Sequence, residues 1–198
     1  MLSRSLAALT FVCLLASILP VKAQGLFFFD PEQIFSGGAP RGAPGMPGVS
    51  ASPIPRTLVA YDGRERPGTI IINTSERRLY LVLGNGQALR YGIGVGRIGF
   101  TWAGVTHVSA KREWPDWTPP AQMLRRRPDL PRHMAGGIDN PLGARAMYLG
   151  STLFRIHGSN EPETIGQAVS SGCFRLTNDD VIDLYNRVHV GARVIVLR

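Results

Sequence analysis

The chain has 198 residues, and its 22 Lys and Arg against 14 Asp and Glu give a formal net charge of +8 at pH 7. A basic chain suits an anionic partner such as a carboxylate-bearing polymer, a membrane surface or nucleic acid, although a solvated basic face alone also aids solubility. The charges are scattered, with Arg125–Arg127 as the only tight run, and nothing has the pattern of a nucleic-acid-binding module.

Residues 1–23 have the order of a secretory signal peptide. Arg4 supplies a positive start, residues 6–19 are apolar apart from Ser and Thr, and residues 21–23 offer a small-residue cleavage site. The apolar run is shorter than the roughly 20 residues that span a bilayer. We therefore expect cleavage, export to the periplasm or cell wall, no membrane span in the mature protein, and a mature net charge of +6, because cleavage removes two basic residues and no acidic one.

Residues 24–67 are predicted to be a flexible linker. Its centre, residues 37–48, is rich in Pro and Gly, which remove hydrogen-bond donors and raise the entropic cost of ordering. Such a stretch is a semi-flexible spacer. Phe27–Phe29 is an apolar patch within it that could dock on the folded domain or meet a membrane or partner.

From Gly68 onward the sequence changes to short β-type runs separated by turns, which predicts one domain over residues 68–198. Asn85-Gly86 separates two of these runs and predicts a hairpin, because both residues tolerate positive φ. Many short strands favour a mainly β fold with a closed or sandwiched sheet. The expected strands are Thr69–Ile72, Leu79–Leu83, Ala88–Tyr91, Val105–Ser109, Ala146–Leu149, Phe154–His157 and Arg193–Leu197.

One short C-terminal helix is expected. Asn178 can cap it, and Asp179 and Asp180 suit the positive end of its dipole. Its apolar face is supplied by Val181, Ile182, Leu184, Tyr185 and Val188.

Two other patterns are set aside. Gly94–Gly99 fits the dinucleotide fingerprint, but no helical pattern follows it to receive a pyrophosphate, so a glycine-rich turn is the better interpretation. The four histidines show no pair at helical ligand spacing and no second mature cysteine accompanies them, so neither a metal nor a cofactor is expected.

Cys173 is the only cysteine of the expected mature chain, because Cys13 lies in the signal peptide. A solitary thiol in an exported protein is either a buried packing group or a reactive one. His157 ends a predicted strand, and the expected helix starts just after Cys173. An imidazole or a helix N-terminus lowers the pKa of a thiol from about 8.5, so these residue types favour catalysis over packing.

The neighbours of Cys173 suit the same chemistry. Ser171 and Gly172 allow a tight turn, and the N–H groups of Gly172 and Cys173 could bind an oxyanion. Arg175 shares a face with Cys173 if the segment is extended, and its planar fork could hold a carboxylate.

Three motifs carry a resemblance to a known family. His157-Gly158-Ser159-Asn160, then Ser-Ser-Gly-Cys-Phe-Arg at residues 170–175 and Asn-Asp-Asp at residues 178–180, resemble the L,D-transpeptidase family, also called the YkuD domain. The family pattern is His-Gly-Thr, Ser-x-Gly-Cys-hydrophobic-Arg and Asn-x-Asp. Ser159 and a bulky Phe174 are mild departures that remove no reacting group. Further matches at residues 67–70, 140–143 and 165–166 extend the resemblance over most of residues 67–198.

The resemblance implies an acyl transfer on peptidoglycan stem peptides. Cys173, with His157 as base and then acid, would attack the bond between an L-centre and D-alanine, and an amine would resolve the thioester. The orienting partner of His157 would be the backbone carbonyl of Gly158, with Ser171 and Gly172 at the oxyanion. Arg175 would hold the substrate carboxylate. Trp114 and Trp117 would either build a wall or lid over the cleft or serve structural packing.

Three rival functions use the same residues. Water could resolve the thioester, which would make a peptidoglycan carboxypeptidase or endopeptidase. A sortase also uses Cys, His and Arg, but its cysteine lies in a Thr-rich strand motif and its arginine lies farther from the cysteine. A non-catalytic wall-binding protein is the third, and intact His157, Cys173 and Arg175 argue against it. The acyl acceptor stays open between a second stem, a wall-anchored protein and a free D-amino acid.

Overall fold

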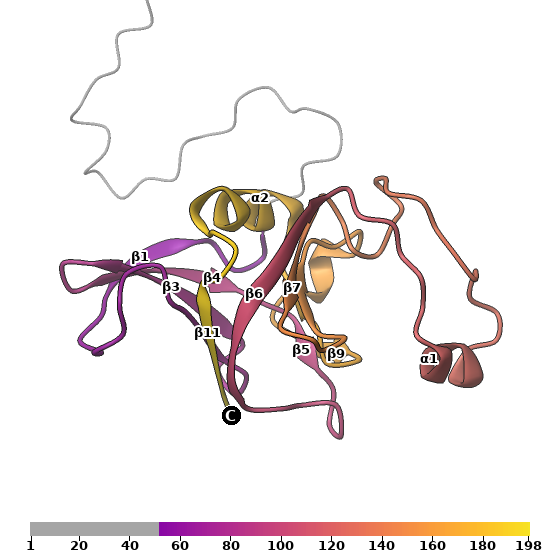
Figure 1. Cartoon of the computed structure of the whole chain (residues 1–198), viewed down its shortest axis with the longest axis horizontal. Helices are drawn as coiled ribbons and strands as arrows, with labels where there is room; N and C mark the ends of the chain where they lie inside the picture. Colours follow the sequence, from indigo (N-terminus) through magenta and orange to yellow (C-terminus); the bar gives the residue numbers. More distant parts are fainter. Residues whose placement is uncertain (1–51) are drawn as a thin grey trace, which may run out of the picture. The chain divides into compact units, whose positions relative to one another are not determined.

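The computed structural model describes residues 52–198. The predicted signal peptide, the Phe27–Phe29 patch and most of the predicted linker therefore lie outside the described residues. Within residues 52–198, no helix has both the length and the apolar character needed to cross a bilayer. Figure 1 shows the chain coloured along its sequence.

Nine strands form one sheet, and a second sheet has two short strands. The large sheet has the order β1-β4-β3-β2-β11-β6-β7-β8-β10, and β5 pairs with β9 in the small one. The strands are β1 (Thr57–Ala60), β2 (Ile70–Asn73), β3 (Arg78–Gly84), β4 (Gln87–Gly92), β5 (Val95–Gly96), β6 (Gly104–Glu113), β7 (Arg145–Leu149), β8 (Arg155–His157), β9 (Ala168–Ser170), β10 (Phe174–Arg175) and β11 (Arg193–Leu197).

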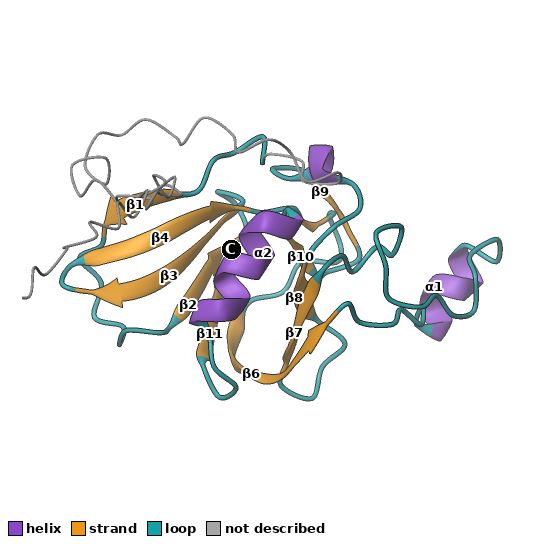
Figure 2. Ribbon diagram, turned by 90° about the horizontal axis from the view of Figure 1, so that it is seen from above, coloured by secondary structure: helices purple, strands orange, loops and turns teal. Residues whose placement is uncertain are grey.

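The long strand β6 joins the two halves of the large sheet, which Figure 2 shows on either side of it. Its first residues, 104–107, pair with β11, and residues 108–113 pair with β7 after a register shift near Val108. The far edge is tied back to the small sheet, because Gly94, just before β5, bridges Arg175 in β10. The sheet is therefore curled, with the site-bearing strands β8 and β10 at one end.

All seven predicted strands are present, with boundaries shifted by a few residues at most except in β6, which runs on to Glu113. Asn85 and Gly86 have φ values of 52° and 70°, so the predicted hairpin turn between β3 and β4 is confirmed. The mainly β fold with one main helix is confirmed as well. The short strands β5, β9 and β10 were not predicted, because two or three residues carry too little alternation to be recognised.

The main helix, α2 (Asn178–Arg187), starts at the predicted position but has a different cap. Thr177 is its N-cap, with the side-chain oxygen accepting the N–H of Asp180 at 3.3 Å, whereas Asn178 is the first helical residue. The prediction of Asn178 as the cap was therefore wrong by one residue. Val181, Leu184 and Val188 of the predicted apolar face enter the core, which combines side chains from both halves of the sheet.

Strand β1 and the residues before it lie within the range predicted as a linker, yet they belong to the folded domain. Thr57–Ala60 pair with β4 at the sheet edge. Ile54 packs so closely on Gly92 and Gly166 that a Cβ at either glycine would overlap its side chain. Arg56 lies 3.3 Å from a carboxylate oxygen of Asp180 and of Asp183 on α2. We call residues 52–60 the N-terminal strap.

A long connection between β6 and β7 carries the short helix α1 (Ala121–Arg126), which extends to one side of the sheet in Figures 1 and 2. Trp117 and Met134 exchange two backbone hydrogen bonds of 2.8 Å at its base. The buried Asn140 side chain donates to the carbonyls of Pro115 and Ala135 and accepts from Leu142 N–H, which closes the loop. A one-turn 3-10 helix (Pro162–Thr164) follows β8.

Candidate active site

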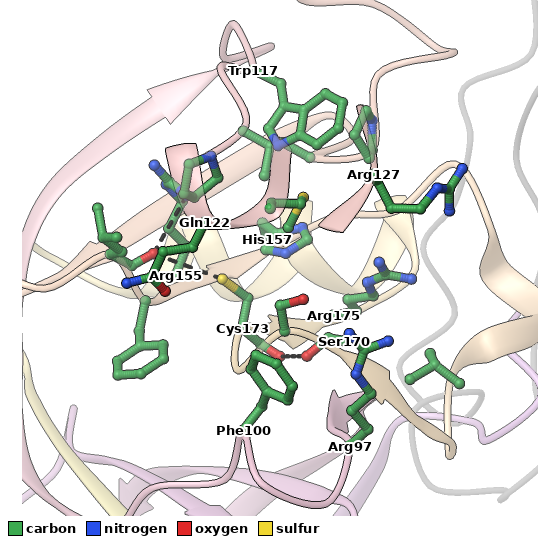
Figure 3. Close-up of a pocket in the computed structure, with 18 of the residues that line it drawn as sticks. Arg97, Phe100, Trp117, Gln122, Arg127, Arg155, His157, Ser170, Cys173 and Arg175 are labelled. Carbon is green, nitrogen blue, oxygen red and sulfur yellow. Dashed lines mark hydrogen bonds between the residues drawn. The ribbon is translucent and has the colours of Figure 1, made fainter. Parts of the chain in front are cut away.

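The parallel pair β8–β10 brings four functional side chains to one face. Arg175 pairs with His157 and Phe174 with Ile156. Because side chains alternate along a strand, Cys173 and Arg175 share a face, and so do Arg155 and His157. All four line one cavity of about 790 Å³ (Figure 3). The structure thus brings together Cys173, His157 and Arg175, which the sequence predicted, and adds Arg155.

His157 is held in one neutral tautomer. Its side chain is buried, and Nδ1 lies 2.6 Å from the carbonyl oxygen of Gly158, which can only accept, so Nδ1 carries the proton. Burial, reinforced by the nearby Arg175 charge, lowers the pKa of His157 to about 3. The ring is therefore uncharged at neutral pH, and Nε2 keeps a free lone pair that can accept a proton.

Cys173 is half-buried in the same cavity, and its sulfur lies 3.8 Å from the carbonyl oxygen of Leu153. Burial raises the pKa of the Cys173 thiol, while the positive charges of Arg155 and Arg175 oppose that rise. The resting pair is therefore a thiol beside a neutral imidazole, not a thiolate beside an imidazolium ion.

The turn before Cys173 requires glycine at position 172. Its φ is +109°, and a Cβ there would overlap the ring of Phe154 and press against the carbonyl oxygen of Phe100. Ser170 fixes this turn, since its hydroxyl accepts the N–H of Gly172 at 3.1 Å and donates to the carbonyl of Cys173 at 2.6 Å. Ser171 lines the cavity beside it.

This geometry changes the expected oxyanion donors. The N–H of Gly172, predicted as one of two donors, is already bonded to Ser170. The N–H of Cys173 has no acceptor among the residues that the structure describes. Of the two predicted backbone donors, the N–H of Cys173 is therefore the one left to face a developing oxyanion.

The bulky Phe174, next to Cys173, is accommodated in an aromatic layer. It is fully buried and lies against Trp102, with ring centroids 5.8 Å apart, and Trp102 in turn stacks on Phe154 at 4.8 Å. Phe154 also lines the cavity, so these stacked rings connect the buried Phe174 to the cavity wall. The aromatic layer supports the strand that presents Cys173.

Arg175 is fixed through both its backbone and its side chain. Its N–H and C=O pair with those of Gly94 at 2.9 Å, and its Nη1 lies 3.0 Å from Oε2 of Glu161. One fifth of the side chain is exposed, on the cavity side. Glu161, which the sequence did not indicate, occupies the position that an anionic ligand of Arg175 would take.

The opposite wall comes from the loop after β5 and from α1. Two guanidinium groups lie at cation–π distance from the Phe100 ring, with Arg97 4.8 Å and Arg126 5.1 Å from its centroid. Trp117 lines the cavity as predicted, whereas Trp114 is not among the lining residues. Trp114 has φ of +40° and is 42% exposed, so it shapes the start of the loop instead.

Asn178 holds the backbone that orients His157. Its Oδ1 accepts the N–H of Ala144 at 2.9 Å. The side chain lies in a slot between Gly143 and Gly158, because a Cβ at either position would overlap its oxygen. The backbone at Gly158, whose carbonyl accepts the hydrogen bond from His157 Nδ1–H, is thereby packed against the start of α2.

The sequence missed residues whose roles depend on register or loop paths. Ser170 and Arg155 each carried a usable signal, since Ser170 precedes the Gly-Cys turn and Arg155 lies two residues before His157 on the same strand face. Arg97, Phe100 and Arg126 carried none, because the paths of the connections between strands determine where they lie. Within residues 52–198, no group of three His, Cys, Asp or Glu side chains lies close enough together to hold a metal ion.

Comparison with known sequences identifies relatives along most of the described chain. The sequence model of the YkuD family, described as the L,D-transpeptidase catalytic domain, matches residues 67–196. The protein named "Probable L,D-transpeptidase ErfK/SrfK" of Escherichia coli K12 is 39% identical over 153 residues, covering 73% of this chain and 48% of its own length. "Probable L,D-transpeptidase YbiS" of the same strain is 40% identical over 150 residues, covering 71% and 47%. The chain thus spans about half the length of these relatives.

The fold has solved counterparts. An L,D-transpeptidase from Mycobacterium smegmatis matches with a TM-score of 0.54 and 17% identity, covering 66% of this chain and 58% of that one. At this identity the likeness concerns the fold alone.

Proposed function

The chain belongs to the L,D-transpeptidase catalytic domain family, and from that premise we propose that it is an exported peptidoglycan L,D-transpeptidase with Cys173 as its nucleophile. The observation that carries the proposal is the His157–Gly158 contact of 2.6 Å. It fixes the tautomer with Nε2 as a proton acceptor, in the cavity that also holds the thiol of Cys173. A thiol and a fixed neutral base are the minimum for forming an acyl-enzyme.

The reaction runs through two acyl transfers. His157 Nε2 takes the Cys173 proton while the sulfur electron pair attacks the carbonyl between the L-centre and D-alanine. The C–N bond then breaks, His157 returns the proton to the departing D-alanine amine, and a thioester remains. An acceptor amine attacks the thioester and gives its proton to His157, and the released sulfur regains a proton.

The N–H of Cys173 is the backbone donor that we assign to the tetrahedral oxyanion in both transfers. It has no acceptor among the described residues, whereas the N–H of Gly172 is bonded to Ser170. The Ser170 bonds hold the turn, so the donor needs no rearrangement when charge develops on the substrate.

The cavity walls support binding of an anionic stem peptide. Arg175 and Glu161 are paired and both line the cavity, so a substrate carboxylate would compete with Glu161 for the same guanidinium. Trp117 and α1 supply the outer wall, which is consistent with a lid. Export to the cell wall is part of the proposal because of the predicted signal peptide. The acceptor of the acyl group is an amine of a second stem, of a wall-anchored protein or of a D-amino acid.

Replacement of Cys173 tests this function. We expect Cys173→Ala to lower D-alanine release from tetrapeptide fragments by about three orders of magnitude or more, because no other group can form the thioester. Mass spectrometry of products with and without an added acceptor amine separates transfer from hydrolysis. Mass spectrometry after treatment with a carbapenem-type β-lactam reports the acyl-enzyme directly.

The matched control is Arg112→Gln, on the exposed end of β6, which should retain full activity. Substantial D-alanine release by a folded Cys173→Ala protein would exclude Cys173 as the nucleophile.

A further inference from the structure

Arg155 occupies the position beside the nucleophile that no predicted residue filled. On the β7–β8 side it pairs with Tyr148, and on the β10 side it lies opposite Cys173, since Arg175 pairs with His157 two residues along both strands. Tyr148, Arg155 and Cys173 therefore form one row across three strands. The next row is Ala146, His157 and Arg175.

Contacts on two sides hold the Arg155 guanidinium in this row. Its carbon lies 5.0 Å from the centroid of the Tyr148 ring, a cation–π distance. Its Nη1 donates to the carbonyl oxygen of Leu153 at 3.4 Å, and the Cys173 sulfur lies 3.8 Å from that same oxygen. The guanidinium and the sulfur thus contact the same carbonyl oxygen, that of Leu153. Figure 3 shows both on the same side of the cavity.

Among the described residues, Arg155 has no carboxylate partner, unlike Arg175 and Arg127 of the same cavity, and it shares this lack with Arg97 and Arg126. Arg175 is paired with Glu161 at 3.0 Å and Arg127 with Asp129 at 2.6 Å. No carboxylate among residues 52–198 lies within 4.0 Å of Arg155, and its buried Nε has no hydrogen-bond partner. A positive charge without a neutralising partner is thus held next to the thiol.

We propose that Arg155 is a further catalytic residue, whose guanidinium stabilises the negative charge that develops on Cys173 Sγ. That charge appears when the thiol proton passes to His157 Nε2, and again when the thioester C–S bond breaks and the electron pair returns to sulfur. The proposal rests on the proposed role of Cys173 as nucleophile, but on no particular substrate.

The electrostatics of the site agree with this role. Burial raises the pKa of the Cys173 thiol. The causes that lower this pKa are, from the largest, the backbone N–H of Arg155, the Arg155 charge, the Arg175 charge and the hydrogen bond from the Arg155 side chain. The other titratable or charged groups of this cavity are His157 on β8, Glu161 after it, Arg97 on the loop after β5, and Arg126 and Arg127 at α1. Of the cations, only Arg155 shares an acceptor atom with the sulfur.

The test measures alkylation of Cys173 by iodoacetamide as a function of pH, which reports the thiol pKa without any peptidoglycan substrate. An opposite charge within about 4–6 Å shifts a pKa by about 1–3 units. We therefore expect Arg155→Gln to raise the thiol pKa by at least about one unit and to slow alkylation about tenfold at a given pH below it. Arg155→Lys should restore part of the shift, because it returns the charge without the planar fork.

Arg112→Gln is the matched control, since it removes the same charge from an exposed position on β6 and should leave the alkylation profile unchanged. Circular dichroism and thermal unfolding verify that each variant is folded. An unchanged thiol pKa in folded Arg155→Gln overturns the proposal, even if the KM for a stem peptide rises, because Arg155 would then bind substrate only. Failure of the proposed function would be distinguishable, because the wild-type protein would then release no D-alanine from stem peptides even though its Cys173 alkylation profile shifts with Arg155→Gln as expected.

Discussion

His157 and Cys173 line the same cavity, where His157 is buried and Cys173 is half-buried. Burial lowers the pKa of the imidazole to about 3 and raises that of the thiol, so both groups rest uncharged. In the reaction that we propose, the thiolate forms only when His157 takes the proton, and the nearby arginines would stabilise its charge as it forms.

This resting state predicts two different pH dependences for one thiol. Because His157 becomes protonated only as the pH falls toward its pKa of about 3, acylation by a carbapenem-type β-lactam should proceed at a nearly constant rate from about pH 5 to pH 8. Alkylation by iodoacetamide requires free thiolate, so its rate should rise about tenfold per pH unit over the same range. Stopped-flow acylation and mass-spectrometric alkylation rates check the pair. An alkylation rate independent of pH would show a resting thiolate–imidazolium pair instead.

At the residue scale the sequence was informative where a motif fixes both residue type and spacing. His157, Cys173 and Arg175 could be predicted because their order in the chain carries the chemistry, and the Gly158 carbonyl lies where the resemblance placed it. The hydrogen bond from the Gly172 N–H to the Ser170 hydroxyl could not be predicted, because it depends on the rotamer of Ser170.

At the scale of elements, the start of α2 organises the site from behind. Asn178 bonds Ala144 N–H at 2.9 Å between Gly143 and Gly158, while Thr177 takes over the capping of the helix. At the other end of the helix, Lys111 donates to the carbonyls of Tyr185 and Val188. The helix is therefore tied at one end to the backbone that orients His157 and at the other end to β6.

Replacing Asn178 should destabilise the domain. Asn178→Ala leaves the Ala144 N–H without its acceptor, which costs about 1–3 kcal/mol when the group is buried. Urea denaturation of the full chain measures the change in the free energy of unfolding.

Asn186→Ala, on the exposed side of the same helix, is the control for helix propensity and should change stability by less than about 0.5 kcal/mol. Equal effects of the two substitutions would contradict a special role for Asn178.

The expected strands came from runs of apolar and β-branched residues, and those runs are present because the core selects them. Ile70 and Ile72 are fully buried, and so is Leu79 on the next strand. The order in which the strands pair could not be predicted, because β11 lies parallel to β2 although more than a hundred residues separate them in the chain. The one-residue error at the helix cap arose because Thr177 and Asn178 both suit an N-cap, and only the Ala144 contact distinguishes their roles.

At the scale of the whole described molecule, the folded unit extends before the family match at residue 67. The N-terminal strap contributes an edge strand, an apolar contact through Ile54 and a cation between two carboxylates. The Tyr91 hydroxyl donates to Asp183 at 2.6 Å, so the network reaches the buried core. A short run such as Thr57–Ala60 between prolines looks like linker in sequence, because its pairing partner lies thirty residues away.

Arg56→Ala should therefore lower the free energy of unfolding. Asp180 is almost wholly buried and one of its oxygens has no hydrogen-bond partner, while the Arg56 side chain is about a third exposed. The expected loss is about 2 kcal/mol, between that of a surface ion pair and that of a buried one. Thermal and urea unfolding of the full chain measure it.

Arg64→Ala is the matched control, because Arg64 is exposed and makes no ion pair among the described residues. If Arg56→Ala unfolds at the same urea concentration as wild type, the strap adds no stability through this contact.

The arginine-lined cavity also acts beyond contact distance. Five arginines face it against a single glutamate, Glu161, so its mouth has a positive potential. At physiological ionic strength such a potential extends about 8 Å into solvent before it is screened. Segments of an anionic polymer would be drawn to the mouth and turned toward it before any atom touches. The cavity would then determine how often encounters succeed, and added salt would reduce that frequency while leaving the chemistry of the bound complex unchanged.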